Sequence, residues 1–158
     1  MVHDVYDVDK HKIGKTAKCE SDLSKGEYLL KSVGWFHDME GNWLVYRMKR
    51  QDKWSCYLET KVLSGEDGRS VIGRCAQEKL GIDLDPCSGI QMETFHLLDT
   101  EISALPWLRE LYVFECDHLD IDKSSLPIRW ISSEDLVYRI LNEDVNIGLK
   151  GFFPVIAR

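Results

Sequence analysis

The sequence lacks the cysteine spacing of a zinc site or of a disulfide-stabilised protein. Its cysteines are scattered, with no Cys-x-x-Cys pair and no histidine-rich segment beside them, so neither kind of site is indicated. Reduced thiols, as in a cytoplasmic protein, explain them most simply, and we therefore expect a cytoplasmic location. The five cysteines are Cys19, Cys56, Cys75, Cys87 and Cys116.

The sequence also lacks long apolar runs and an excess of positive charge. No apolar run approaches the ~20 residues of a membrane-spanning helix, and the first residues contain no apolar signal core. The formal net charge is −7, whereas a nucleic-acid surface or an anionic-membrane surface needs a basic stripe that contacts phosphates. We therefore expect neither nucleic acid nor membrane among the partners.

No internal repeat, low-complexity segment or Ser/Gly linker divides the chain. Its 158 residues, 44% of them hydrophobic, suffice for one proper core and are too few for two ordinary domains. The prediction is a single domain over residues 1–158.

The central stretch, Thr60–Ile82, predicts a loop, a helix and a stop. The helix is expected from about Asp67 to Leu80, ended by Gly81 in the left-handed conformation. Its apolar residues recur at helical spacing: Val71, Ile72, Cys75, Ala76 and Leu80.

Three charged residues complete this predicted helix. Arg74 and Glu78 are spaced as an i, i+4 pair. On a helical wheel Lys79 falls within the apolar stripe, where a charge must border a cleft or find a partner. The alternative is that Lys79 complements the helix dipole and reaches past its neighbours to water.

Alternating apolar and polar residues predict strands on both sides of this helix. The segment Val2–Cys19 predicts a hairpin with its turn near Asp9–Lys12. Further strands are expected at Tyr28–Phe36, Trp43–Met48, Ile90–Leu98, Leu108–Cys116 and Ile128–Ser132. Ser132 or Ser133 should cap a last helix that runs through Asn142, and its expected buried residues are Leu136, Val137, Ile140 and Leu141.

The central stretch resembles the Nudix signature: a glycine, five residues, a glutamate, seven residues, then Arg-Glu-apolar-any-Glu-Glu-any-Gly-apolar. Thr60, Cys75 and Lys79 replace the leading glycine and two of the three helix glutamates, so the box is degenerate. The matching residues are Glu66, Arg74, Ala76, Glu78, Gly81 and Ile82.

The opening of the chain carries a second resemblance. Asp4–Asp7 followed by Ile13–Thr16 is similar to the N-terminus of the Nudix branch related to isopentenyl diphosphate isomerase. Together the two resemblances imply a fold of the α/β (α+β) class, a Nudix-type αβα sandwich with a mixed β-sheet packed between helices.

The resemblance also implies a chemistry. Nudix enzymes hydrolyse a diphosphate linked to another group, with Mg²⁺ or Mn²⁺ held by the helix glutamates and a backbone carbonyl near the leading glycine. The residual catalytic residues would be Glu66, Arg74 and Glu78. A thiol at Cys75 is a poor ligand for Mg²⁺, and an ammonium at Lys79 repels it. Mg²⁺ or Mn²⁺ is thus the expected cofactor if there is one, weakly held, and no cofactor is the alternative.

Glu59 occupies the position of the other glycine that usually precedes the helix. It could act as a substitute metal ligand beside Glu78, or as the salt-bridge partner of Lys79. We favour the salt bridge, because the two opposite charges then neutralise each other and no cofactor is required.

Basic residues near the box are the candidates for substrate binding. Arg50 and Lys53 precede the box. In related enzymes, basic residues in this segment can face the diphosphate, so both are candidate phosphate contacts. The alternative is that they belong to a solvated charged loop. Lys79 could contact a substrate phosphate directly.

Three functions are compatible with these residues. The first is a pseudoenzyme that has lost, or nearly lost, diphosphatase activity and serves as a ligand-binding or interaction module. The second is a slow Mg²⁺- or Mn²⁺-dependent hydrolase of a nucleoside diphosphate linked to another moiety. The third, a prenyl diphosphate isomerase, ranks below both because Cys56 is not set in that family's cysteine motif.

The expected partners are few. The resemblance implies a small-molecule diphosphate ligand. The apolar tail, Gly151–Ile156, should dock on the domain itself or on a second copy, which makes a homodimer an expectation.

Overall fold

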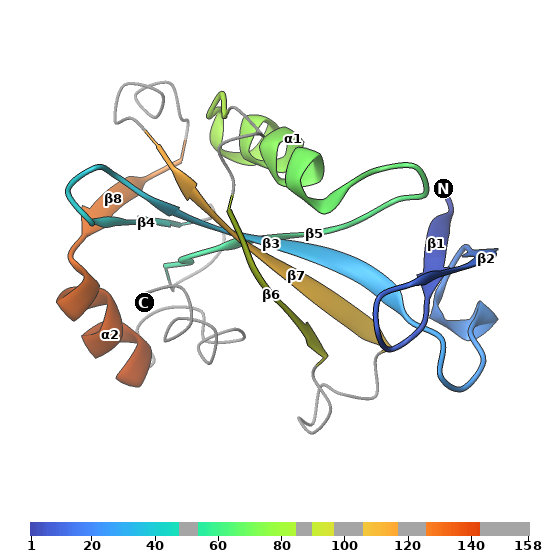
Figure 1. Ribbon diagram of the computed structural model, residues 1–158. Helices are drawn as coiled ribbons and strands as arrows, with labels where there is room; N and C mark the ends of the chain where they lie inside the picture. The colour runs from blue at the N-terminus through green and yellow to red at the C-terminus, as the bar shows by residue number, and fades with distance from the viewer. Residues whose placement is uncertain (48–53, 85–89, 97–105, 117–125, 143–158) are drawn as a thin grey trace.

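A computed structural model describes residues 1–47, 54–84, 90–96, 106–116 and 126–142, with only the backbone described for 90–96 (Figure 1). The strands are β1 (His3–Tyr6), β2 (Lys12–Ala17), β3 (Leu29–His37), β4 (Trp43–Tyr46), β5 (Leu58–Lys61), β6 (Ile90–His96), β7 (Trp107–Glu115) and β8 (Ile128–Ile131). The helices are the short 3-10 helix η1 (Glu20–Asp22), α1 (Gly68–Leu80) and α2 (Ser133–Leu141).

The central sheet is mixed. Its strands follow the order β6-β7-β3-β4-β8, and β5 also pairs with β3. Strands β3 and β7 run parallel, in register from Leu29 with Trp107 to His37 with Glu115. The other pairings are antiparallel. Strands β1 and β2 form a separate hairpin, as the alternation at the start of the chain predicts.

The two faces of the sheet carry different helices. On β7, Leu111 and Val113 belong to the cluster that contains Leu136 of α2. The alternate residues, Tyr112 and Phe114, belong to the cluster that contains Ile72 of α1. Successive side chains on a strand point to opposite faces, so α1 and α2 lie on opposite sides of the sheet, as Figure 1 shows. The predicted αβα sandwich is confirmed.

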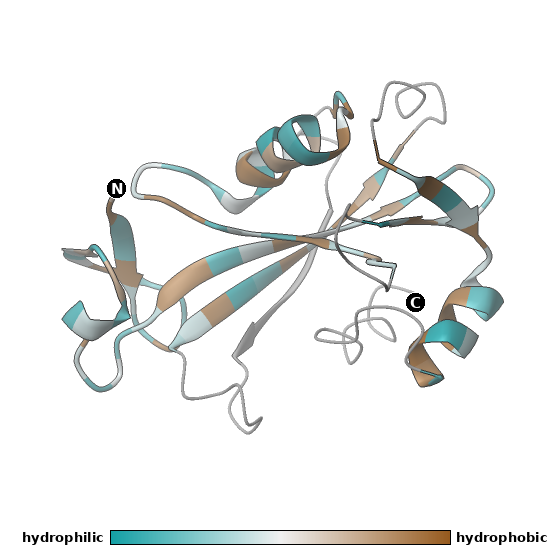
Figure 2. Ribbon diagram, turned by 180° about the vertical axis from the view of Figure 1, so that it is seen from behind, coloured by the Kyte–Doolittle hydropathy of each residue, from teal (hydrophilic) through white to brown (hydrophobic). Residues whose placement is uncertain are grey.

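Helix α1 forms where the sequence predicts it. Asp67 is its N-cap and accepts hydrogen bonds from the backbone N–H groups of Arg69 and Ser70, and Gly81 ends it at φ +66°. The predicted apolar residues are buried, and hydrophilic residues lie on the outer side of the helix (Figure 2). Lys79 is exposed, so of the two predicted outcomes the structure supports the one in which its side chain reaches past its apolar neighbours to water.

The buried face of helix α2 is narrower than predicted. Ser132 caps it by accepting from the backbone N–H of Asp135, and Leu136 and Ile140 are buried. Val137 and Leu141, however, are 40% and 76% exposed. The helix therefore buries a narrower stripe than four apolar residues suggest.

Some predicted segments fall outside the described residues. Met48, residues 97–98 and the apolar tail Gly151–Ile156 are among them. Within the described part of the chain, no helix is long and apolar enough to cross a membrane.

Candidate functional site

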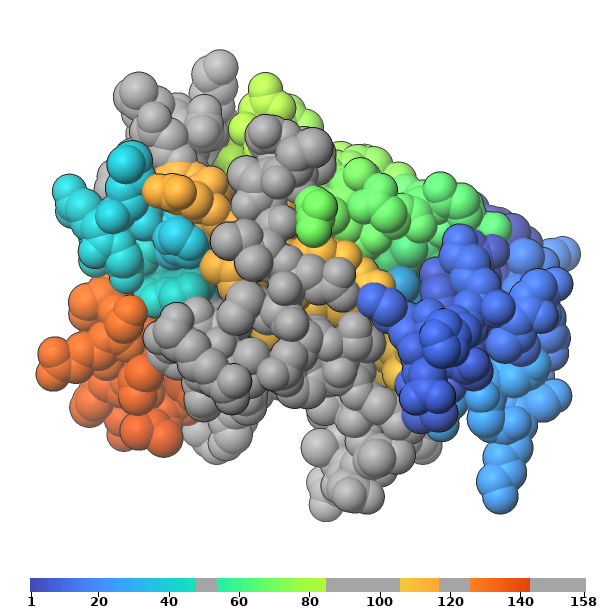
Figure 3. All heavy atoms as spheres, in the orientation of Figure 1, coloured from blue at the N-terminus to red at the C-terminus, as the bar shows by residue number. Residues whose placement is uncertain are grey.

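A cavity of about 700 Å³ lies where β5, α1 and the N-terminal hairpin meet. Figure 3 shows the blue surface of the hairpin against the green surface of the segment that runs from β5 to α1. The hairpin contributes His3, and the residue after β2 is Lys18. Strand β5 contributes Thr60 and Lys61, and α1 contributes Arg74 and Glu78.

Positive charge dominates the walls of this cavity. Lys18, Lys61 and Arg74 are cationic, whereas Glu78 is the one carboxylate among the described residues that line it. Arg74 is paired with Glu66 and Glu78. The positive potential that attracts anionic ligands therefore comes mainly from Lys18 and Lys61. The hydroxyl group of Thr60 adds a neutral hydrogen-bonding group.

The loop between β5 and α1 keeps the hydrogen bonds that give it its shape. One carboxylate oxygen of Glu66 accepts from the backbone N–H of Leu63 at 3.1 Å, and Arg74 donates to the other. Arg74 Nε also lies 3.9 Å from a carboxylate oxygen of Glu78, so the predicted i, i+4 pair is confirmed. Glu66 thus connects the loop to the helix without any ligand.

The last turns of α1 do not gather carboxylates. Cys75 is only 5% exposed and packs in the core, and burial raises the pKa of its thiol. Lys79 is exposed, and the side chain of Glu78, 69% exposed, points to water beside Arg74. Of the three places where the signature has helix glutamates, one here carries a carboxylate.

Glu59 lies on the other side of the sheet from α1. Its two carboxylate oxygens bind Lys31 Nζ at 3.2 Å and Arg109 Nε at 3.1 Å. The expected salt bridge with Lys79 is therefore wrong. Strand geometry explains the error, because Leu58 packs with α1 and the next side chain along β5 must point to the opposite face.

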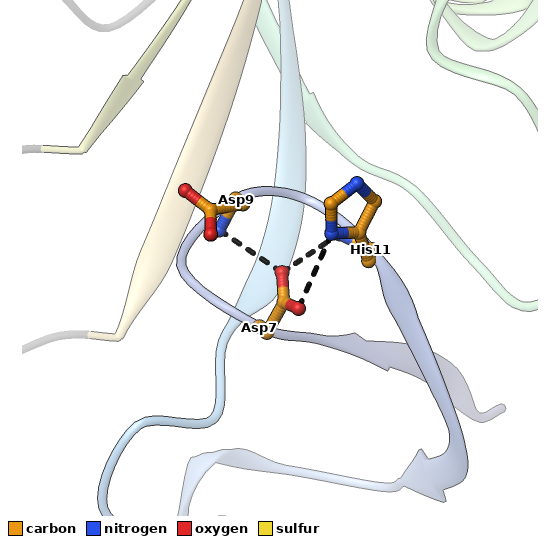
Figure 4. Close-up of side chains that lie close together, drawn as sticks. All are labelled: Asp7, Asp9 and His11. Carbon is orange, nitrogen blue, oxygen red and sulfur yellow. Dashed lines mark hydrogen bonds and ion pairs between the residues drawn. The ribbon is translucent and has the colours of Figure 1, made fainter.

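The box residues do not fit a tight site for a divalent cation, which needs several converging oxygen ligands. Across the part of the chain that the structure describes, one trio of His, Cys, Asp or Glu has ligand atoms within 4.8 Å of one another. It is Asp7, Asp9 and His11, in the turn between β1 and β2 (Figure 4). Glu59, Glu66 and Glu78 are not in it.

The trio of Asp7, Asp9 and His11 holds the turn together. One oxygen of Asp7 accepts from the backbone N–H groups of Asp9 and His11, each at 2.9 Å. Its other oxygen lies 3.4 Å from His11 Nδ1. The hydrogen bond from the His11 backbone is the main cause that lowers the pKa of Asp7.

A buried carboxylate that the sequence analysis missed fastens the hairpin to the sheet. Glu110 on β7 is 6% exposed, lies 2.9 Å from Lys10 Nζ in the hairpin turn, and accepts from the hydroxyl of Tyr112. A Cβ at Gly68 would lie 2.5 Å from a carboxylate oxygen of Glu110, so a larger residue there would displace this carboxylate. The sequence does contain a signal for this contact, because the charged residue Glu110 stands within the apolar strand predicted at Leu108–Cys116.

Three further residues from the sequence analysis have different outcomes. Arg50 and Lys53 lie outside the described residues, and their contact with a phosphate stays a prediction. Cys56 is 2% exposed, and burial raises the pKa of its thiol to about 12. Such a thiol is almost entirely protonated at neutral pH, which disfavours a nucleophilic or acid–base role for it.

Comparisons of the sequence identify no relative: no protein-family model matches it, and no curated protein does. Solved structures do match the fold. DR0079 from Deinococcus radiodurans matches with a TM-score of 0.71 at 19% identity, over 100% of both chains.

A second solved structure is a bifunctional NMN adenylyltransferase/ADP-ribose pyrophosphatase from Francisella tularensis, complexed with AMP and a Mn ion. It matches with a TM-score of 0.60 at 12% identity, over 82% of this chain and 41% of that one. Together the two likenesses support a Nudix-type fold. At these identities they concern the fold alone.

Proposed function

We propose that this Nudix-fold chain binds a small molecule that contains a diphosphate, that side-chain cations hold the ligand, and that diphosphatase activity is lost or strongly reduced. One observation carries the proposal: Lys18, Lys61 and Arg74 surround the cavity beside α1. In the family that the sequence resembles, carboxylates and a metal ion occupy this region.

The cavity suits such a ligand in size and charge. Small-molecule sites commonly measure roughly 300–1,000 Å³, and this one measures about 700 Å³. Hydrogen bonds between ionised donors and phosphate oxygens are about twice as strong as neutral ones. The two lysines can therefore neutralise much of the charge of a diphosphate without a metal ion, whereas Arg74 is already paired with Glu66 and Glu78.

Hydrolysis needs more than binding. An attacking water must be activated by a base or a metal ion, and charge must be stabilised as the bond to phosphorus breaks. The carboxylates that could do this are dispersed: Glu59 binds Lys31 and Arg109, and Glu66 binds Arg74. Turnover is therefore expected to be slow or absent.

The alternative is a slow Mg²⁺- or Mn²⁺-dependent hydrolase of a nucleoside diphosphate linked to another moiety. Glu78 in the cavity favours it, as does the neighbour described as an ADP-ribose pyrophosphatase with a Mn ion. In this case Glu78 and Glu66 would be the residual ligands, and Arg74 would have to release one of them.

Calorimetric titration with inorganic diphosphate in the presence of a chelator tests the proposal. The substitution Lys61→Gln should weaken binding by about ten-fold, the loss expected for one charge-assisted contact. Lys25→Gln is the control, because it removes the same charge from an exposed lysine that is not a cavity residue. Equal effects of the two substitutions, or no binding without a divalent cation, would contradict the proposal.

A further inference from the structure

We infer that a second anion site lies at the β4–β8 end of the sheet, where Arg47 and Arg129 both lie against the indole of Trp54, and that it takes a phosphate group. This site is separate from the cavity beside α1. It shares no lining residue with that cavity.

Three neighbouring backbone segments bring these side chains together. Arg47 follows β4, and Trp54 precedes Ser55, whose backbone exchanges hydrogen bonds of 2.7 and 2.9 Å with Tyr46. Arg129 lies on β8 and pairs with Val45 of β4. Alternation along the strands then places the three side chains on one face of the sheet.

The two guanidinium groups lie against the same ring. Their central carbons are 5.4 Å (Arg47) and 4.7 Å (Arg129) from the centroid of the Trp54 indole. Both arginines are exposed, whereas Trp54 is half-buried and packs against the core cluster on the α2 side. The indole is thus a fixed support, and the arginines can contact a ligand from solution.

Among the residues that the structure describes, neither arginine has a carboxylate counter-charge. No described Asp or Glu lies within 4.0 Å of Arg47 or Arg129, although Arg74, Arg109 and Arg139 each have such a partner. The two unpaired charges are no more than about 10 Å apart, which is within one Debye length at 0.1 M salt. In a chain with a net charge of −7, this repulsion is relieved when an anion binds between them.

Trp107 shows the same arrangement in a neutralised form. Lys31 and Lys61 lie 4.7 and 5.4 Å from the centroid of its ring. There, however, Lys31 is bound to Glu59, the indole N–H donates to Glu20, and the ring is only 2% exposed. At Trp107 the chain supplies a carboxylate to one of the two lysines, whereas among the described residues it supplies none to the arginines at Trp54.

The chemistry of the guanidinium group selects the ligand. A guanidinium stacked on an aromatic ring keeps its N–H donors in its own plane, where they form a fork that matches phosphate oxygens. Two such groups suit a dianion better than a single carboxylate. A phosphate group is therefore the anion we assign to this site.

Titration with inorganic phosphate, followed through the indole N–H signals in ¹H–¹⁵N NMR spectra, tests this assignment. The Trp54 signal, identified by its loss in Trp54→Phe, should shift saturably with phosphate and not with chloride at equal ionic strength. Arg47→Gln and Arg129→Gln should each weaken this response by about ten-fold. Arg129→Lys should also weaken it, because lysine keeps the charge but loses the fork.

Two controls separate this site from other causes. Arg139→Gln removes an arginine that already binds Asp135 and should leave the Trp54 response unchanged. Lys61→Gln should weaken binding in the cavity and also leave it unchanged. A Trp54 signal that does not respond to phosphate, that still responds when both arginines are glutamine, or that loses its response in Lys61→Gln would overturn the assignment.

Discussion

The two halves of the segment from Leu63 to Lys79 differ in how their charged and polar side chains are used. In the first half, from Leu63 to Arg74, Glu66 accepts from the Leu63 backbone and binds Arg74, and Asp67 caps the helix. In the second half, Cys75 is in the core and Lys79 in solvent. The first half shapes the loop and the second would hold a metal ion, so the comparison indicates that the two roles can be separated.

Restoring the carboxylates of the second half should have the largest effect. The double substitution Cys75→Glu/Lys79→Glu places three glutamates at adjoining positions of α1, and Mn²⁺ affinity should rise on the order of 100-fold. Electron paramagnetic resonance measures free Mn²⁺ during the titration.

The matched control is Gln77→Glu/Lys79→Glu, which likewise removes the ammonium and adds two carboxylates but leaves Cys75 in place. Gln77 lies on the exposed side of α1, so a glutamate introduced there lies away from the ligand positions. The affinity for Mn²⁺ should therefore rise much less. Equal rises in both proteins would mean that net charge, and not the position of the carboxylates, controls metal binding.

Removing one carboxylate from each half sharpens the comparison. Glu66→Ala loses a backbone hydrogen bond and a partly exposed ion pair, and should lower the free energy of unfolding by about 1–2 kcal/mol. Glu78→Ala removes a side chain that is 69% exposed and should change it by less than about 0.5 kcal/mol. Urea denaturation measures both, and a larger loss for Glu78→Ala would reverse the assignment of roles.

The helix cap of the first half should be dependent on pH. Hydrogen bonds, first from the Ser70 backbone, lower the pKa of Asp67 from 3.8. Its stabilising contribution is therefore complete above the unfolded value and is lost as the pH falls through the lower folded value. Asp67→Ala should cost about 1 kcal/mol at pH 7, and this difference should shrink below pH 3.8.

Asp67→Asn is the control for the cap, since asparagine caps helices about as well as aspartate. It should cost little at pH 7. If the difference between the native protein and Asp67→Ala stays constant in acid, the cap does not depend on the charge of Asp67.

The sequence predicted the backbone of α1 well and the directions of its charges poorly. Asp67 and Gly81 are local signals for a helix start and stop, and both are confirmed. The sequence left two outcomes open for Lys79, because a helical wheel shows angular position and not the depth of the surrounding surface. Its predicted contact with a phosphate stays a prediction.

Contacts between distant strands were harder to predict than local structure. The binding of Glu59 to Lys31 and Arg109 depends on which strands neighbour β5, and sequence spacing does not contain that information. The contact between Lys10 and Glu110 likewise joins residues that are 100 positions apart. The carboxylates that the sequence offers as metal ligands are thus committed by tertiary contacts that only the structure shows.

The central claim is that cations of the protein, and not a bound metal ion, hold the diphosphate. Calorimetry of the unaltered protein with inorganic diphosphate, first with a chelator and then with saturating Mg²⁺ or Mn²⁺, tests it most directly. The account predicts an affinity that the chelator does not lower, with no phosphate released during the titration. Binding that appears only with the divalent cation and is followed by rapid release of phosphate would contradict it.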